Sequence, residues 1–124
     1  METRKLSSMG LSVSLVAVML ACCSTLSASP DSSVAAGENL FKSHCVLCHG
    51  PDATGNTVLG KQLKAKNLHS AIVQKKTDPE LKKIITDGEG NMPPFSAQLS
   101  GAQIEELVAF IRQLGKSKLG KSKK

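Results

Sequence analysis

The apolar residues near the end of this 124-residue chain recur at spacings of three and four, the repeat of a helix with one buried face. Ser100 and Gln103 fit the capping box that starts a helix, and Gly115 fits a residue that ends one. We therefore predict an amphipathic helix between Ser100 and Gly115. Its apolar positions are Ile104, Leu107, Val108, Ile111 and Leu114.

Two earlier segments show the same repeat. A helix is predicted from Ala35 to Cys48, with Ser32 or Ser33 as its N-cap. Its apolar face holds Leu40, Phe41, Cys45 and Cys48. Another helix is predicted between the capping box of Thr77 and Glu80 and the terminating Gly88, after a short helix over residues 70–76. The stripe of the longer one is Leu81, Ile84 and Ile85.

Turn-forming residues separate these helices. Residues 50–67 predict an extended loop because they contain Gly50, Pro51, Gly55 and Gly60. Residues 88–95 predict a second loop, in which Pro93 biases Met92 towards an extended backbone. A methionine held in so stiff a loop is not an obvious core residue, so Met92 is a candidate ligand for a metal.

The composition indicates that this fold needs stabilisation beyond its hydrophobic core. The chain has three Phe residues and neither Trp nor Tyr, and its length leaves room for one domain, which we place at residues 34–115. A domain of this size buries little apolar surface and usually recruits a disulfide, a metal or a prosthetic group.

The N-terminal residues 1–23 are predicted to be an export signal. Arg4 and Lys5 precede an apolar run from Gly10 to Cys23, which is too short to span a bilayer comfortably. Residues 24–33 are rich in serine and predict a flexible linker to the domain.

The end of the signal leaves two interpretations open. Met19-Leu20-Ala21-Cys22 is similar to the lipobox of bacterial lipoproteins, in which Cys22 would be acylated and would attach the protein to a membrane. Ordinary cleavage after Ser27 or Ser29 would instead release a soluble periplasmic protein.

The formal net charge of +6 lies mostly in the C-terminal tail. Residues 34–115 contain nine Lys or Arg and eight Asp or Glu, whereas residues 116–124 contain five lysines and no acid. Such a run is typical of a solvated terminus, although docking to a partner or to a membrane surface stays open. Nucleic-acid binding is not supported, because no aromatic residues are interleaved with the lysines.

The segment Cys45-Val46-Leu47-Cys48-His49 carries the chemistry of the chain, because this spacing matches the attachment sequence of a c-type haem. On a helix the three reactive side chains project from one face, so two thiols reach the vinyl groups of one porphyrin edge and the imidazole reaches the iron. A dithiol redox motif and half of a zinc site with His44, His49 or His69 are the alternatives.

The other histidines fit this site less well. His44 is expected at the surface, because its direction on the helix differs from that of His49. His69 is expected at the surface and, as the alternative, on the iron. A haem-ligating histidine normally donates its second ring proton to a backbone carbonyl, which we expect from the 50–67 loop.

Residues 35–114 resemble a class I bacterial cytochrome c. Gly37 and Phe41 match positions of the family's first helix, and Leu107 and Phe110 match the pair on the last helix that crosses it. Met92-Pro93 matches the distal loop of the family. One departure is that the loop after His49 lacks the Gly-Pro-x-Leu element that often supplies the histidine's carbonyl partner.

The resemblance implies an all-α fold of three main helices around one haem c, which Cys45 and Cys48 hold covalently and His49 and Met92 ligate. It also implies a one-electron carrier between periplasmic or membrane-bound redox partners. We do not expect an enzyme, because the acidic residues are scattered and the sequence offers no acid–base or nucleophilic group of residues. The alternative is a haem subunit of a larger oxidoreductase or a haem protein with a displaceable distal ligand. Two lysine clusters would steer acidic partners if they border the haem edge. The clusters are Lys61, Lys64 and Lys66, and Lys75, Lys76, Lys82 and Lys83.

Overall fold

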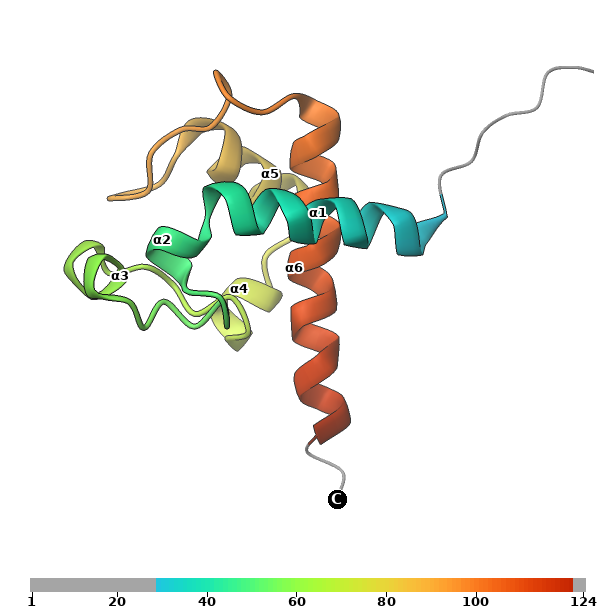
Figure 1. Ribbon diagram of the computed structural model, residues 1–124, viewed down its shortest axis with the longest axis horizontal. Coiled ribbons are helices and arrows are strands. Elements are labelled where there is room, and N and C mark those ends of the chain that lie inside the picture. The colour runs from blue at the N-terminus through green and yellow to red at the C-terminus, as the bar shows by residue number, and fades with distance from the viewer. Residues whose placement is uncertain (1–28, 122–124) are drawn as a thin grey trace, which may run out of the picture.

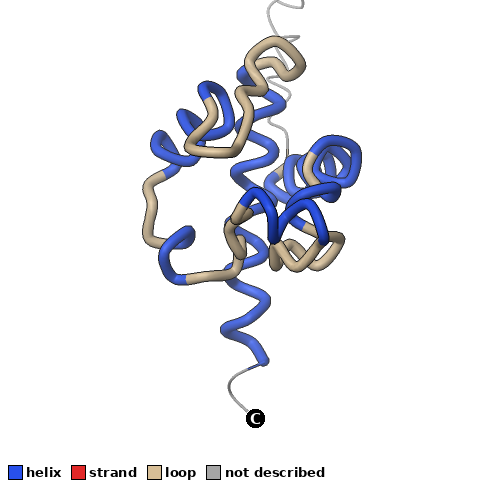
Figure 2. Tube along the Cα trace, turned by 90° about the vertical axis from the view of Figure 1, so that its left-hand side faces the viewer, coloured by secondary structure: helices blue, strands red, loops and turns tan. Residues whose placement is uncertain are grey.

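The computed structural model describes residues 29–121, with side chains up to residue 117. This part is helical throughout its regular structure and contains no strand, so the predicted all-α architecture is confirmed (Figures 1 and 2). None of the helices in residues 29–121 has the length and apolarity needed to span a membrane. The six helices are α1 (Pro30–His44), α2 (Val46–His49), α3 (Val58–Leu63), α4 (Ala71–Gln74), α5 (Asp78–Asp87) and α6 (Gly101–Lys121).

The crossing of α1 over α6 organises the fold (Figure 1). A glycine is needed at the crossing, because a Cβ on Gly37 would lie 2.0 Å from the backbone oxygen of Glu106. Beside it the Phe41 and Phe110 rings pack with centroids 5.3 Å apart. The contact expected between the first and last helices is therefore confirmed.

Apart from Phe41 of α1, the buried core is aliphatic and is shared by α4, α5, α6 and the intervening loops. Leu107 of α6 is its most completely buried large side chain. The predicted stripes supply most of it, because Leu81, Ile85, Ile104, Val108 and Ile111 are also buried.

The start of α6 is as predicted, but its end is not. Ser100 Oγ accepts from the Gln103 N–H, and the Gln103 side chain accepts from the Ser100 N–H, which completes the capping box. The helix does not stop at Gly115, however, and continues to Lys121. Gly115 instead permits close packing, because a Cβ there would lie 2.3 Å from Oε1 of Gln74.

The first helix begins earlier than predicted. Pro30 stands at its first position, where a missing N–H costs nothing, and Ser29 is the N-cap. Ser32 and Ser33, the expected caps, lie inside the first turn and bond back to the carbonyls of Ser29 and Pro30. Residues 30–33, which we assigned to the linker, are therefore helical.

Helices α4 and α5 follow the prediction closely. Ser70 caps α4, and the reciprocal bonds of Thr77 and Glu80 start α5, which ends at Gly88. The carboxylate of Glu80 has a lowered pKa because it accepts from the backbone and side chain of Thr77.

The 50–67 segment is not the extended loop that we predicted, because it contains α3. Thr57 caps this helix by accepting from the Gly60 N–H. Gly60 is buried inside it, and a Cβ there would lie 2.2 Å from the carbonyl oxygen of Cys48. This glycine therefore allows α3 to pack against α2 and does not break the helix.

Candidate functional site

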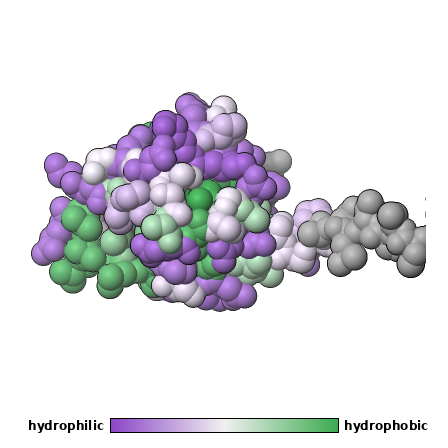
Figure 3. All heavy atoms as spheres, turned by 90° about the horizontal axis from the view of Figure 1, so that it is seen from above, coloured by the Kyte–Doolittle hydropathy of each residue, from purple (hydrophilic) through white to green (hydrophobic). Residues whose placement is uncertain are grey.

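A cavity of about 540 Å³ opens between α2, α3, α5, α6 and the 88–95 loop. Its walls are mainly aliphatic and aromatic, so it suits a large, flat apolar group. In Figure 3 exposed apolar surface gathers at the end of the molecule where α2 and α3 lie, and the exposed Leu47 and Val58 belong to these helices. The apolar walls include Phe41, Leu68, Val73, Leu81, Ile85, Phe95, Leu99, Leu107 and Ile111.

The Cys45–His49 segment forms one edge of this cavity. The helix is interrupted at Cys45, where α1 ends, and it resumes as α2. The backbone nevertheless keeps helical spacing, because the His49 N–H donates to the Cys45 carbonyl at 2.9 Å. Cys45, Cys48 and His49 therefore all line the cavity, although the continuous helix that we predicted through Cys48 is wrong.

A hydrogen bond fixes the ring of His49. Its Nδ1 lies 3.0 Å from the carbonyl oxygen of Lys66 and donates to it, which leaves the lone pair of Nε2 for a metal. Burial lowers the pKa of His49, and the bond to Lys66 opposes this shift. The ring is therefore held in the neutral form that metal binding requires. Lys66 lies in the segment expected to supply this carbonyl.

Thr57 supports the attachment segment, a role that we did not predict. Its hydroxyl lies 2.9 Å from the carbonyl oxygen of Leu47 and 3.1 Å from that of Cys48, so it donates to this pair while it caps α3. A threonine before Val-Leu-Gly is an N-cap signal that could have revealed it. The role of Lys66 rests on its backbone, which leaves no signal in the sequence.

The environment of the cysteines disfavours the dithiol interpretation. Burial, with a smaller contribution from Cys48, raises the pKa of the Cys45 thiol to about 11. Redox-active thiols of thioredoxin-like motifs have depressed pKa values instead. Neither cysteine is in a disulfide. Within residues 29–121 no three His, Cys, Asp or Glu side chains gather as a metal site, so no zinc ligand set accompanies the pair.

Met92 reaches the same cavity from the 88–95 loop. It is half-buried against the core, and its backbone exchanges two hydrogen bonds with Glu89, of 3.0 and 3.2 Å. The Phe95 N–H donates to the Ile85 carbonyl and so ties the far end of the loop to α5. The loop is thus anchored on both sides of Met92.

The other two histidines occupy different positions. His44 is exposed at the cavity. His69 is half-buried and is not among the residues that line the cavity. Its ring nitrogens lie 3.0 Å from the Leu114 carbonyl oxygen and 2.9 Å from that of Asp52. It therefore links α6 to the loop after the motif, a structural role that we did not predict.

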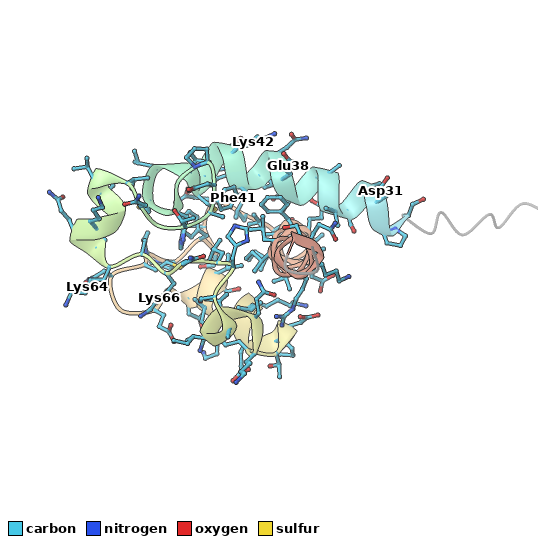
Figure 4. The ribbon with its side chains drawn as sticks, turned by 90° about the horizontal axis from the view of Figure 1, so that it is seen from below. Asp31, Glu38, Phe41, Lys42, Lys64 and Lys66 are labelled. Atoms are coloured by element: carbon cyan, nitrogen blue, oxygen red, sulfur yellow. The ribbon has the colours of Figure 1, made fainter. Side chains whose placement is uncertain are left out.

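The two predicted lysine clusters separate in the structure. Lys64, Lys66 and Lys76 line the cavity. Lys82 and Lys83 instead form ion pairs with Glu105 and Asp87. In Figure 4 Lys64 and Lys66 lie on the α3 side, apart from the Glu38–Lys42 pair on the outer face of α1.

These features fit a covalently bound haem. A c-type haem needs two thiols and an imidazole along one edge of an apolar cavity, and it takes a second axial ligand such as a thioether. Cys45, Cys48, His49 and Met92 line one cavity with apolar walls, and the Nδ1 bond of His49 leaves its other ring nitrogen free to bind.

Comparison with known proteins decides the family. Residues 32–111 match the family described as cytochrome c oxidase, cbb3-type, subunit III. The chain belongs to this family of c-type cytochromes. Its resemblance to the class I cytochromes c is thereby confirmed, and with it the class I fold and the covalently bound haem c.

Relatives of the cytochrome fall into two groups. Subunit FixP of the cbb3-type cytochrome c oxidase of Rhizobium etli is 35% identical over 83 residues, which is 65% of this chain and 28% of that protein. Subunit CcoP of Rubrivivax gelatinosus is 34% identical over 108 residues, 73% of this chain and 33% of that protein. The cytochrome therefore spans about a third or less of these oxidase subunits.

Smaller proteins match it over more of their length. Cytochrome c6 of Picosynechococcus sp. is 33% identical over 84 residues, 62% of this chain and 69% of that protein. The solved structure of the KustC0563 c-type cytochrome superposes with a TM-score of 0.56 at 34% identity, covering 63% of this chain and 95% of that one. The match thus covers most or nearly all of these two smaller cytochromes.

Proposed function

We propose that this cytochrome is a one-electron carrier in which Cys45 and Cys48 hold one haem c, and His49 and Met92 are the axial ligands. The observation that carries the proposal is the convergence of these four side chains on a single apolar cavity. They come from two segments more than forty residues apart in the chain, and each segment is fixed by its own hydrogen bonds.

Each residue has a defined task in this proposal. When bound, haem c supplies an iron that changes its oxidation state by one electron. Cys45 and Cys48 keep the group in place by thioether bonds. His49 binds through Nε2 while Lys66 holds its ring, and Met92 offers a soft, neutral sulfur. The apolar walls exclude water and favour the less charged, reduced state.

Filling both axial positions favours transfer over catalysis. A site with two protein ligands leaves no position for a substrate, and little must rearrange when an electron moves. A second candidate, a haem subunit of a larger oxidoreductase, is supported by the relatives that are named as oxidase subunits. Co-purification of the cytochrome with other subunits would favour this second candidate.

The cavity-lining lysines support docking of an acidic redox partner. Residues 53–77 carry five lysines and no acid, and three of these, Lys64, Lys66 and Lys76, line the cavity. Positive charge at the opening would raise the encounter rate with a negatively charged protein in an ionic-strength-dependent way.

We also propose that the cytochrome is exported and works in the periplasm or on a membrane facing it. Residues 1–23, the signal with its Cys22, lie outside the described residues, as do residues 24–28 of the linker and 122–124 of the basic tail. If Cys22 is acylated, the mature protein should partition with membranes, and Cys22→Ala should abolish this. A mature protein that is soluble and cleaved after Cys22 would contradict acylation.

Carbon monoxide tests the ligand set directly, because it binds reduced haem iron only where an axial position is open. The wild-type cytochrome should bind it slowly and incompletely, whereas Met92→Ala should bind it rapidly and stoichiometrically. Met92→Ala should also lose the weak far-red absorption that sulfur ligation gives oxidised iron. Rapid, stoichiometric binding by the wild type would contradict the proposal.

A further inference from the structure

The opening of the cavity has two sides that are distant in sequence. Leu63 and Lys64, at the end of α3, line one side, and Asn91 and Met92 of the 88–95 loop line the other. In Figure 1 the tip of this loop reaches the α3 end of the molecule. The first side belongs to the segment that holds His49, through the carbonyl of Lys66, and the second side carries Met92.

One side-chain hydrogen bond joins the two sides. Nδ2 of Asn91 donates to the carbonyl oxygen of Leu63 at 3.1 Å. Within the described residues this is the only hydrogen bond or ion pair between residues 50–67 and residues 88–95. The connection between the two sides therefore depends on one amide group.

The Leu63 carbonyl is available as an acceptor because of the way α3 ends. Lys64 adopts a left-handed conformation with φ 57°. Its N–H donates to the carbonyl of Lys61, and the N–H of Ala65 donates to that of Gly60. No backbone N–H in the described part of the chain donates to Leu63, so its carbonyl is one of those that lack a backbone partner at a helix C-terminus. Asn91 satisfies it.

The neighbouring residues in the loop face different surroundings. Asn91 is exposed at the rim, while Met92 is half-buried against the core. The backbone bonds between Glu89 and Met92 form a tight turn, so a restraint on Asn91 is transmitted to Met92 through one peptide unit. The other backbone hydrogen bonds of the loop lie at its two ends, where Gly88 and Phe95 donate to α5 and the Phe95 carbonyl accepts from Gln98 and Leu99.

We propose that Asn91 is a positioning residue for Met92, a latch that keeps the sulfur at the iron by tying its loop to the end of α3. This inference rests on the proposed ligation by Met92. The latch would lower the fraction of time for which the distal position is open. It would thus set the rate at which external ligands reach the iron, although Asn91 itself does not contact the iron.

The test compares carbon monoxide association with the reduced holoprotein in three variants. Asn91→Ala removes the amide, and Asn91→Asp places an acceptor where a donor is needed. Asn39→Ala, at an exposed position of α1 away from the cavity, is the control. Both Asn91 variants should bind carbon monoxide about fivefold faster than the wild type, the factor expected for one net hydrogen bond. They should also show a weaker far-red band, with unchanged haem content and helicity.

Three results would count against the latch, and the first two are distinguishable. If both Asn91 variants match Asn39→Ala in association rate and far-red band, the hydrogen bond does not position Met92, although the ligand set stands. If the wild type already lacks the far-red band and binds carbon monoxide as fast as Met92→Ala, ligation by Met92 fails and the latch fails with it. A variant of Asn91 with lowered thermal stability but wild-type association kinetics also counts against the proposal.

Discussion

At the scale of single residues, the site combines reactive side chains with backbone groups that restrain them. The carbonyl of Lys66 orients His49, and the hydroxyl of Thr57 donates to the carbonyls of Leu47 and Cys48. Burial acts with these bonds, because it keeps the Cys45 thiol protonated and the His49 ring neutral. In the apoprotein the Cys45 thiol is therefore protected from oxidation before haem is attached.

The cysteines give the prediction that belongs to this scale. Cys45→Ser and Cys48→Ser should each leave one thioether, which shifts the reduced spectrum and lowers the yield of holoprotein. The double variant should release its haem to acidified organic solvent, because no covalent bond remains. Extraction followed by absorption spectroscopy measures this. Haem that can be extracted from the wild type would contradict attachment through this pair.

The candidate haem-binding residues could be predicted from the sequence, but several contacts that support them could not. The candidates are identified by a spacing and a context that are unusual for core residues, and they are Cys45, Cys48, His49 and Met92. His69 has no such context, and only the fold brings it between Asp52 and Leu114. The acceptor for His49 is a backbone carbonyl, which any residue type would provide.

At the scale of elements, the crossing of α1 and α6 depends on close approach at Gly37. We expect Gly37→Ala to destabilise the holoprotein by about 3 kcal/mol, because the new methyl group would overlap the backbone oxygen of Glu106. Chemical denaturation followed by circular dichroism measures the loss.

Gly101→Ala is the matched control for this substitution. Gly101 also lies in a helix, but a Cβ there would meet nothing within 4 Å. Alanine should therefore leave stability unchanged or raise it by up to about 1 kcal/mol. Equal effects of the two substitutions would show that helix propensity, and not the crossing, determines the cost.

Helix positions were predictable where caps and apolar stripes agreed, as in α5 and at the start of α6. The errors came from glycines whose role is tertiary. Gly60 and Gly115 have the residue type of a loop or a helix stop, yet both stand inside helices at points of close contact with Cys48 and Gln74. A single sequence does not distinguish a glycine that breaks a helix from one that lets another group approach.

At the scale of the whole molecule, charge is distributed unevenly around the cavity. The lysines of α1 and α5 are mostly neutralised by ion pairs, as Lys42 is by Glu38. Those at the cavity, such as Lys64 and Lys66, have no ion-pair partner among the described residues. Three lysines thus line the cavity against one carboxylate, that of Glu89, and this balance favours approach of an acidic partner.

Small redox reagents test this distribution without a natural partner. Replacing Lys64, Lys66 and Lys76 together by alanine should slow oxidation of the reduced cytochrome by hexacyanoferrate(III) several-fold at low ionic strength, and added salt should diminish the difference. Stopped-flow absorption measures both rates.

A second triple variant has the same net charge and serves as the control. It replaces Lys42, Lys82 and Lys83, which form ion pairs and do not line the cavity. This variant should react nearly as fast as the wild type. Equal slowing of the two variants would mean that total charge, and not its position at the cavity, controls the encounter.

We propose that this chain carries one covalently attached haem c with histidine and methionine on the iron. The most direct test is the absorption spectrum of the exported wild-type protein in both oxidation states, extended into the far red. We predict a low-spin c-type spectrum when reduced and a weak far-red sulfur band when oxidised, with haem that stays with the protein after acid extraction. A high-spin spectrum without the far-red band, or haem that is extracted, would contradict the claim.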